Sequence, residues 1–105
     1  MLDLNYLCKM AYENAKKRAE HEDKIKLPTF DTLKHCAGEI VEATDAYIYY
    51  NGNKNGTTKA VFADELADVV CCVLTICGQE NIDIELALTK CMEKNFMRGK
   101  QDETR

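Results

Sequence analysis

The chain has 105 residues, a formal net charge of -4, 46% hydrophobic residues and 30% charged residues. This length suits a single domain over residues 1–105, and the composition is ordinary for a soluble globular protein. The negative charge disfavours a surface for a nucleic-acid polymer, which is usually basic, and no segment reaches the roughly 20 apolar residues of a membrane span.

Four helices are predicted in chain order, over about residues 2–22, 30–50, 59–80 and 84–98, and no segment predicts a strand. In the first helix, apolar residues recur at steps of three and four. Pro28 interrupts the chain, and Thr29 or Asp31 is expected to cap the second helix. The turn-rich sequence NGNKNG, residues 51–56, predicts a flexible loop.

Local signals also mark the last connection and the end of the chain. Asn81 is expected to end the third helix in the left-handed conformation that asparagine tolerates, and Asp83 is expected to cap the fourth. The final residues, GKQDETR, are expected to fray. Helices joined by short connections predict an all-α bundle.

The six cysteines show neither a CxxC motif nor a metal-type pairing with histidine. No signal peptide is apparent at the start of the sequence. We therefore expect reduced thiols, several of them in the core, and a cytoplasmic location. A redox function through Cys71 and Cys72 is disfavoured because adjacent side chains on a helix point about 100° apart.

The second predicted helix carries three acids at steps of three residues, Glu39, Glu42 and Asp45. Because a helix turns 100° per residue, Glu39 falls within a stripe of small residues that includes Ala43 and Ala46. Glu42 lies one step around the helix, and Asp45 lies at the edge. Glu39 is therefore not part of an ordinary charged face.

The third predicted helix repeats this pattern, with Asp68 one step around from Glu65, and Glu65 surrounded by Phe62, Val69, Cys72 and Ile76. The helix is apolar nearly all round, which predicts burial on most sides. In a four-helix chain of this length, such burial predicts a dimer or a larger assembly.

Neighbouring ionised carboxylates repel each other, and burial adds to the cost. Two compensations remain open: salt bridges to lysine and arginine, or a divalent cation, for which oxygen ligands favour Mg²⁺ or Mn²⁺. The fourth predicted helix has a basic strip of Lys90, Lys94 and Arg98, and Asn95 falls in its apolar register. The tyrosines of the second helix are interpreted as packing or interface residues, and His35 as an ordinary surface or packing residue.

Three motifs together resemble the MazG-like family of the all-α nucleoside triphosphate pyrophosphohydrolase superfamily. They are ExxExxDA from Glu39, DELADVV with Glu65 and Asp68, and EKNFMR with Lys94, Asn95 and Arg98. The resemblance covers residues 29–98. It implies a four-helix MazG-like bundle that assembles through helices into a dimer or tetramer. It also implies Mg²⁺-dependent hydrolysis of a nucleoside triphosphate to the monophosphate and pyrophosphate.

The resemblance implies roles for individual residues. Metal ligands would be Glu39, Glu42, Glu65 and Asp68; Glu42 or Glu39 would help to deprotonate the water that attacks the α-phosphorus; and Lys94, Asn95, Arg98 and Asp45 would contact phosphate or sugar. A related phosphoribosyl-ATP, dUTP or dCTP pyrophosphohydrolase remains open. A non-catalytic helical interaction module, in which the acids pair with the basic strip, is the alternative from a different class.

Overall fold

The computed structural model describes residues 2–22, 28–52 and 58–103, and every regular element in these ranges is an α-helix. The elements are α1 (Leu4–His21), α2 (Thr29–Asn51), α3 (Lys59–Gln79) and α4 (Ile84–Glu103). The predicted all-α chain of four helices is confirmed. None of the described helices combines the length and apolar character needed to cross a bilayer.

Three of the helices begin with side-chain caps, and two of these caps are at α1 and α3. The Tyr6 N–H donates to Asp3 Oδ1 at the start of α1 (3.0 Å), and the Val61 N–H donates to Thr58 Oγ1 at the start of α3 (3.3 Å). The predicted cap of α2 is wrong, because Pro28 is its N-cap residue and offers no side-chain acceptor. The Thr29 hydroxyl instead donates to Glu80 Oε2 at 2.7 Å, which joins the start of α2 to the end of α3.

The turn between α3 and α4 follows the predicted chemistry. Asn81 has a φ of 54°, in the left-handed region, and the Ile82 N–H donates to the Cys77 carbonyl at 2.9 Å. This bond closes the helix end in a Schellman motif. Asp83 caps α4 by accepting the Leu86 N–H at 3.1 Å. Both predictions for this turn are confirmed.

The boundaries of α2 and α4 differ from those predicted. Helix α4 continues to Glu103, so the expected fraying of the tail is wrong for residues 99–103, while residues 104–105 lie outside the described part. Helix α2 extends to Asn51 and ends at Gly52. The rest of the predicted loop, residues 53–56, lies outside the described residues.

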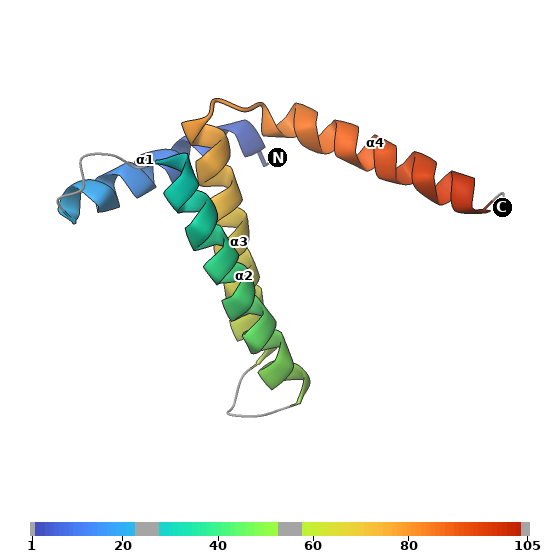
Figure 1. Ribbon diagram of the computed structural model, residues 1–105, viewed down its shortest axis with the longest axis horizontal. Coiled ribbons are helices and arrows are strands. Elements are labelled where there is room, and N and C mark those ends of the chain that lie inside the picture. The colour runs from blue at the N-terminus through green and yellow to red at the C-terminus, as the bar shows by residue number, and fades with distance from the viewer. Residues whose placement is uncertain (1, 23–27, 53–57, 104–105) are drawn as a thin grey trace.

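Helices α2 and α3 pack side by side as an antiparallel pair, α1 crosses α3, and α4 extends away from the other three (Figure 1). The start of α4 is fixed by Asn5, whose amide donates to Asp83 Oδ1 and whose oxygen accepts the Ile84 N–H, both at 3.1 Å. The Cα radius of gyration is 16.9 Å, against about 13 Å for a compact domain of this size. The single chain is therefore three packed helices with a projecting fourth, and not a closed bundle.

Small side chains and thiols dominate the core. Its buried apolar residues are Cys8, Ala15, Ala19, Cys36, Ala43, Ala46, Cys72, Leu74, Cys77 and Ile84. All six cysteines are free, as predicted. Gly78 marks the closest approach of α1 and α3, because a Cβ there would lie 2.6 Å from both the Cys8 carbonyl oxygen and Tyr12 Cβ. Only glycine fits this crossing without a shift of α1.

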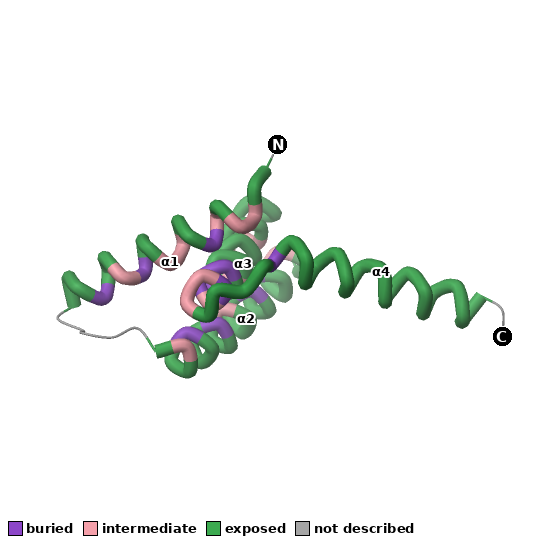
Figure 2. The backbone as a smooth tube through the Cα atoms, turned by 90° about the horizontal axis from the view of Figure 1, so that it is seen from above, coloured by how far each residue is buried: buried purple, intermediate pink, exposed green. Residues whose placement is uncertain are grey.

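Much of the chain is exposed (Figure 2), and the exposed residues include many with large apolar side chains. On α3 these are Val61, Leu66, Val70 and Val73, so the burial on most sides that the sequence predicts for this helix is incomplete. On α4 only Ile84 is buried. A single copy of the chain thus leaves extensive apolar surface in contact with water.

Candidate metal centre

Three of the four carboxylates predicted to bind metal meet between α2 and α3. Glu39, Glu42 and Glu65 each offer a carboxylate oxygen, and these oxygens lie within 4.8 Å of one another. Glu39 and Glu65 are half-buried, whereas Glu42 is exposed. The antiparallel packing of α2 and α3 places these residues together, because each glutamate lies at or beside the face that its helix turns toward the other. We call these three residues the acidic cluster.

Two oxygens of the acidic cluster lack a partner. Glu39 Oε2 and Glu65 Oε2 are buried and accept no hydrogen bond from the described residues. A buried carboxylate oxygen without a donor or a cation is energetically unfavourable. Opposed ligands of Mg²⁺ stand about 4.2 Å apart, since each Mg–O bond is about 2.1 Å. The oxygen spacing and the hard donor set therefore fit Mg²⁺ or Mn²⁺ after a small closure.

The surroundings of Glu65 disfavour the ionised form of its carboxyl group. Desolvation by burial raises the pKa of its carboxyl, and the negative charges of Glu42, Asp68, Glu39 and Asp64 raise it further. Each of these causes disfavours the ionised form. A cation among these carboxylates would reverse the effect, which is the expected property of a site that binds positive charge.

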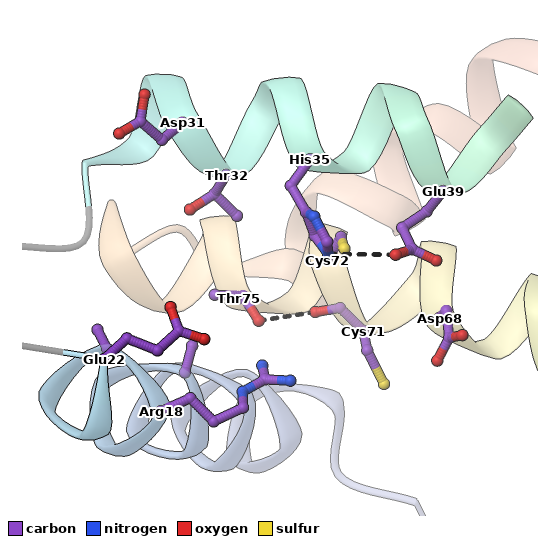
Figure 3. Close-up of a pocket in the computed structure, with 12 residues that line it drawn as sticks. Arg18, Glu22, Asp31, Thr32, His35, Glu39, Asp68, Cys71, Cys72 and Thr75 are labelled. Atoms are coloured by element: carbon purple, nitrogen blue, oxygen red, sulfur yellow. Dashed lines mark hydrogen bonds and ion pairs between the residues drawn. The ribbon is translucent and has the colours of Figure 1, made fainter. Parts of the chain in front are cut away.

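A groove of about 550 Å³ lies between α1, α2 and α3 and reaches the acidic cluster at Glu39 (Figure 3). This volume is within the range of small-molecule sites, roughly 300–1,000 Å³. Asp68, the fourth predicted metal ligand, lies on the α3 side of the same end, near Glu39. The groove is lined by Ala15, Arg18, Ala19, Glu22, Asp31, Thr32, His35, Glu39, Asp68, Cys71, Cys72 and Thr75.

Two basic side chains of the groove were not predicted as site residues. His35 Nε2 lies 3.2 Å from Glu39 Oε1, while the His35 side chain is largely exposed, so His35 is a surface residue that contacts one cluster carboxylate. In the sequence, its position one helical turn before Glu39 was the feature that could have predicted this contact. Arg18 lines the groove from α1, and its guanidinium extends toward α3 (Figure 3). Arg18 lies on the charged side of α1, and nothing in the sequence predicted that it would line the groove.

The predicted phosphate-binding residues are not brought to the cluster within one chain. Lys94, Asn95 and Arg98 are exposed on α4, which extends away from α2 and α3 (Figure 1). Asn95 does not point inward as its register suggested; its amide lies 3.8 Å from Cys91 Sγ. Asp45 is exposed on α2 and does not belong to the acidic cluster.

Tyrosines of α2 pack as expected. The rings of Tyr47 and Tyr50 lie 5.4 Å and 6.1 Å from the ring of Phe62 on α3. These contacts confirm the packing interpretation for both tyrosines. They join α2 to α3 near the end of the pair that is remote from the groove.

A scan against protein families, a search of curated proteins and a search of solved structures each found no match to this chain. Its function is therefore inferred from the chemistry of its own residues.

Proposed function

We propose that this protein is a Mg²⁺-dependent nucleotide pyrophosphohydrolase, which hydrolyses a nucleoside triphosphate to the monophosphate and pyrophosphate. One observation carries the proposal: three carboxylates from two helices converge beside a ligand-sized groove, and two of their oxygens are buried without a partner. The resemblance of these residues and Asp68 to the MazG-like motifs supports the same reaction.

Glu39, Glu42 and Glu65 would hold the metal ion, with Asp68 as a further ligand from the groove side. When bound, Mg²⁺ supplies neutralisation of phosphate charge and acidification of a coordinated water. Mn²⁺ suits the same oxygen ligands and should replace it. His35 keeps the Glu39 carboxylate in place through its 3.2 Å contact.

Glu42 is the preferred general base. It is the exposed member of the acidic cluster, whereas one oxygen of Glu39 is already engaged by His35. A carboxylate oxygen of Glu42 would accept a proton from the water whose oxygen attacks the α-phosphorus. The bond between the α-phosphorus and the bridging oxygen then breaks, and pyrophosphate leaves with its electron pair. Glu39 is the alternative base.

The groove would receive the nucleoside. The guanidinium of Arg18 supplies hydrogen-bond donors along its wall. The buried hydroxyls of Thr32 and Thr75 donate instead to the carbonyls of Pro28 and Cys71. Asp45 on α2 and Lys94, Asn95 and Arg98 on α4 would contact phosphate or sugar, as the resemblance implies. We further propose that the active form is a homo-oligomer, since a single chain keeps α4 away from the cluster.

The direct test is a panel of ribo- and deoxynucleoside triphosphates, together with phosphoribosyl-ATP, incubated with Mg²⁺ or Mn²⁺ and assayed for pyrophosphate. At least one substrate should release pyrophosphate. Glu65→Gln should lose on the order of 100-fold in rate or more, since changes even behind metal ligands cost 10–100-fold. Asp64→Asn, an exposed neighbour outside the cluster, is the matched control and should remain active. No pyrophosphate from any nucleotide refutes the enzyme.

The exposed apolar surface of α4 favours a second candidate, a non-catalytic helical interaction module. In that case the acidic cluster would bind no metal. Thermal melts with increasing Mg²⁺ separate the two candidates, because only a binding site predicts stabilisation that grows with metal concentration.

A further inference from the structure

The groove between α1, α2 and α3 has two unlike ends. One end reaches Glu39 and Asp68, and the opposite end is flanked by Glu22 and Asp31, which we call the end carboxylates (Figure 3). Glu22 follows the last turn of α1, and Asp31 lies in the first turn of α2. Asp31 precedes Glu39 on α2 by about 12 Å along the helix axis. A nucleotide held by its phosphates at the acidic cluster therefore extends its base toward the end carboxylates.

Small side chains form the wall between the two ends. Ala15 and Ala19 of α1 and Cys72 of α3 are buried along it. None of the described lining residues is aromatic, so the groove offers no ring on which a base would stack. Apolar contact is non-directional, and these residues accept the flat face of any base. Selection among bases therefore depends on the polar groups of the groove.

The two hydroxyls of the groove are already engaged. Thr32 Oγ1 donates to the Pro28 carbonyl at 3.3 Å and accepts the Gln79 side-chain amide at 3.0 Å. Thr75 Oγ1 donates to the Cys71 carbonyl at 2.8 Å. A hydroxyl has a single hydrogen, so neither threonine has a donor left for a ligand.

Arg18 and the end carboxylates are therefore the polar groups that meet a ligand in the half of the groove remote from the acidic cluster. Arg18 supplies N–H donors, and its guanidinium extends toward α3 (Figure 3). Glu22 and Asp31 are exposed. An ionised carboxylate accepts hydrogen bonds and donates none. This end of the groove thus requires hydrogen-bond donors from its ligand.

The nucleobases differ in what they present to such an end. Cytosine, adenine and guanine each carry an exocyclic amine, whose N–H groups are hydrogen-bond donors. Uracil, thymine and hypoxanthine carry no amine, and their ring N–H lies beside a carbonyl oxygen. A carbonyl oxygen turned toward a carboxylate places two acceptors together without a hydrogen, which is unfavourable. Every base also carries an acceptor, so Arg18 binds each of them without discriminating.

We propose that the groove selects nucleotides whose base carries an exocyclic amine, with the end carboxylates accepting its N–H groups. Aspartate and glutamate accept the same kind of hydrogen bond from the amine of cytosine in nucleic-acid recognition. This selection rests on the proposed function, which makes a nucleotide the ligand of the groove. Asp31 also has a structural effect, because an acid in the first turn stabilises a helix. That effect is the same for every base, so a preference between bases separates the two roles.

Calorimetric titration with nucleoside monophosphates in the presence of Mg²⁺ tests the selection. Guanosine and inosine monophosphates differ only by the exocyclic amine, and cytidine monophosphate has an amine where uridine monophosphate has a carbonyl oxygen. In each pair the nucleotide with the amine should bind about tenfold more tightly, which is the effect of one hydrogen bond to a charged group. Equal affinities, tighter binding of the partner without the amine, or no binding of any of the four overturns the selection.

The role of Glu22 and Asp31 is tested by replacing both with amides. Glu22→Gln combined with Asp31→Asn keeps the side-chain shape and adds N–H donors, so the preference for the amine should disappear. The matched control combines Glu13→Gln with Glu20→Gln, which removes two negative charges from exposed positions of α1 outside the groove. It should keep the preference. A preference retained in the first variant, or lost in the control, overturns the role of the end carboxylates.

Failure of the selection and failure of the proposed function are distinguishable. Binding of a monophosphate requires no turnover, so a chain that prefers bases with an amine yet releases no pyrophosphate contradicts only the reaction. A chain that releases pyrophosphate equally well from cytidine and uridine triphosphates contradicts only the selection.

Discussion

The crossing of α1 over α3 makes a sharp prediction at Gly78. A Cβ at this position would lie 2.6 Å from the Cys8 carbonyl oxygen and 2.6 Å from Tyr12 Cβ. Both atoms belong to α1 and lie on or next to its backbone, so no side-chain rotation relieves the overlap. Gly78→Ala must therefore push α1 away from α3, which would also move the wall of the groove that carries Arg18.

The expected magnitude follows from two opposing effects. Inserting a methyl group into a tightly packed contact costs about 1–3 kcal/mol, and the backbone obstruction places Gly78 toward the upper end. Alanine regains about 1 kcal/mol over glycine in a helix interior. We expect a net loss of about 1–2 kcal/mol in the free energy of unfolding, because the overpacking exceeds the gain in helix propensity.

Gly38→Ala is the matched control, since Gly38 is also helical and a Cβ there would meet nothing within 4 Å. It should stabilise the protein by about 0.5–1 kcal/mol. Urea unfolding of both variants at one protein concentration measures the difference. The concentration is held fixed because the proposed association would contribute to stability. If Gly78→Ala is as stable as Gly38→Ala, the close approach of α1 and α3 is wrong.

Three further predictions concern the site and the turn. Without metal, the folded chain raises the pKa of Glu65 above its ordinary value of 4.5. The contribution of protonated Glu65 to the free energy of unfolding is therefore fully present below pH 4.5, and it is lost as the pH rises through the raised pKa. In urea unfolding without divalent ions, Glu65→Gln should make the free energy of unfolding fall less with rising pH. A pH dependence equal to that of the wild type would contradict the placement of Glu65. Asn81→Gly should stabilise the protein by about 0.5–1 kcal/mol, because glycine adopts the left-handed φ of 54° without strain; a loss in thermal melts would contradict this. Arg18→Ala should raise KM about tenfold, the effect of losing one charge-assisted hydrogen bond, with kcat unchanged, whereas Lys17→Ala on the same helix should change neither.

Local signals predicted most of the secondary structure. Helix positions follow from apolar periodicity, and the α3–α4 turn follows from the conformational tolerance of Asn81 and the capping oxygen of Asp83. The meeting of Glu39 with Glu65 was also accessible, because each acid interrupts an apolar face and such faces pack together. The helix positions and the turn depend on neighbours within one or two turns, whereas the meeting of the two acids requires only that the two apolar faces pack together.

Features that depend on distant residues were harder to predict. The Thr29 hydroxyl binds Glu80 on another helix instead of capping its own, and no local pattern distinguishes the two choices. Arg18 enters the groove because α1 crosses α3 at Gly78, a crossing that helical periodicity does not specify. The projection of α4 away from the other helices was not predicted, because the apolar register of a helix is the same whichever surface covers it.

The turn at Asn81 is short and hydrogen-bonded, so it connects α3 and α4 rigidly. One residue inserted near the end of α3 would rotate everything after it by about 100° and displace it by about 1.5 Å. The cations of α4 would then face a different direction relative to Glu65. Variants of this chain should therefore tolerate substitutions between Glu65 and Lys94 better than insertions or deletions there. Deletion scanning of this segment would measure the difference.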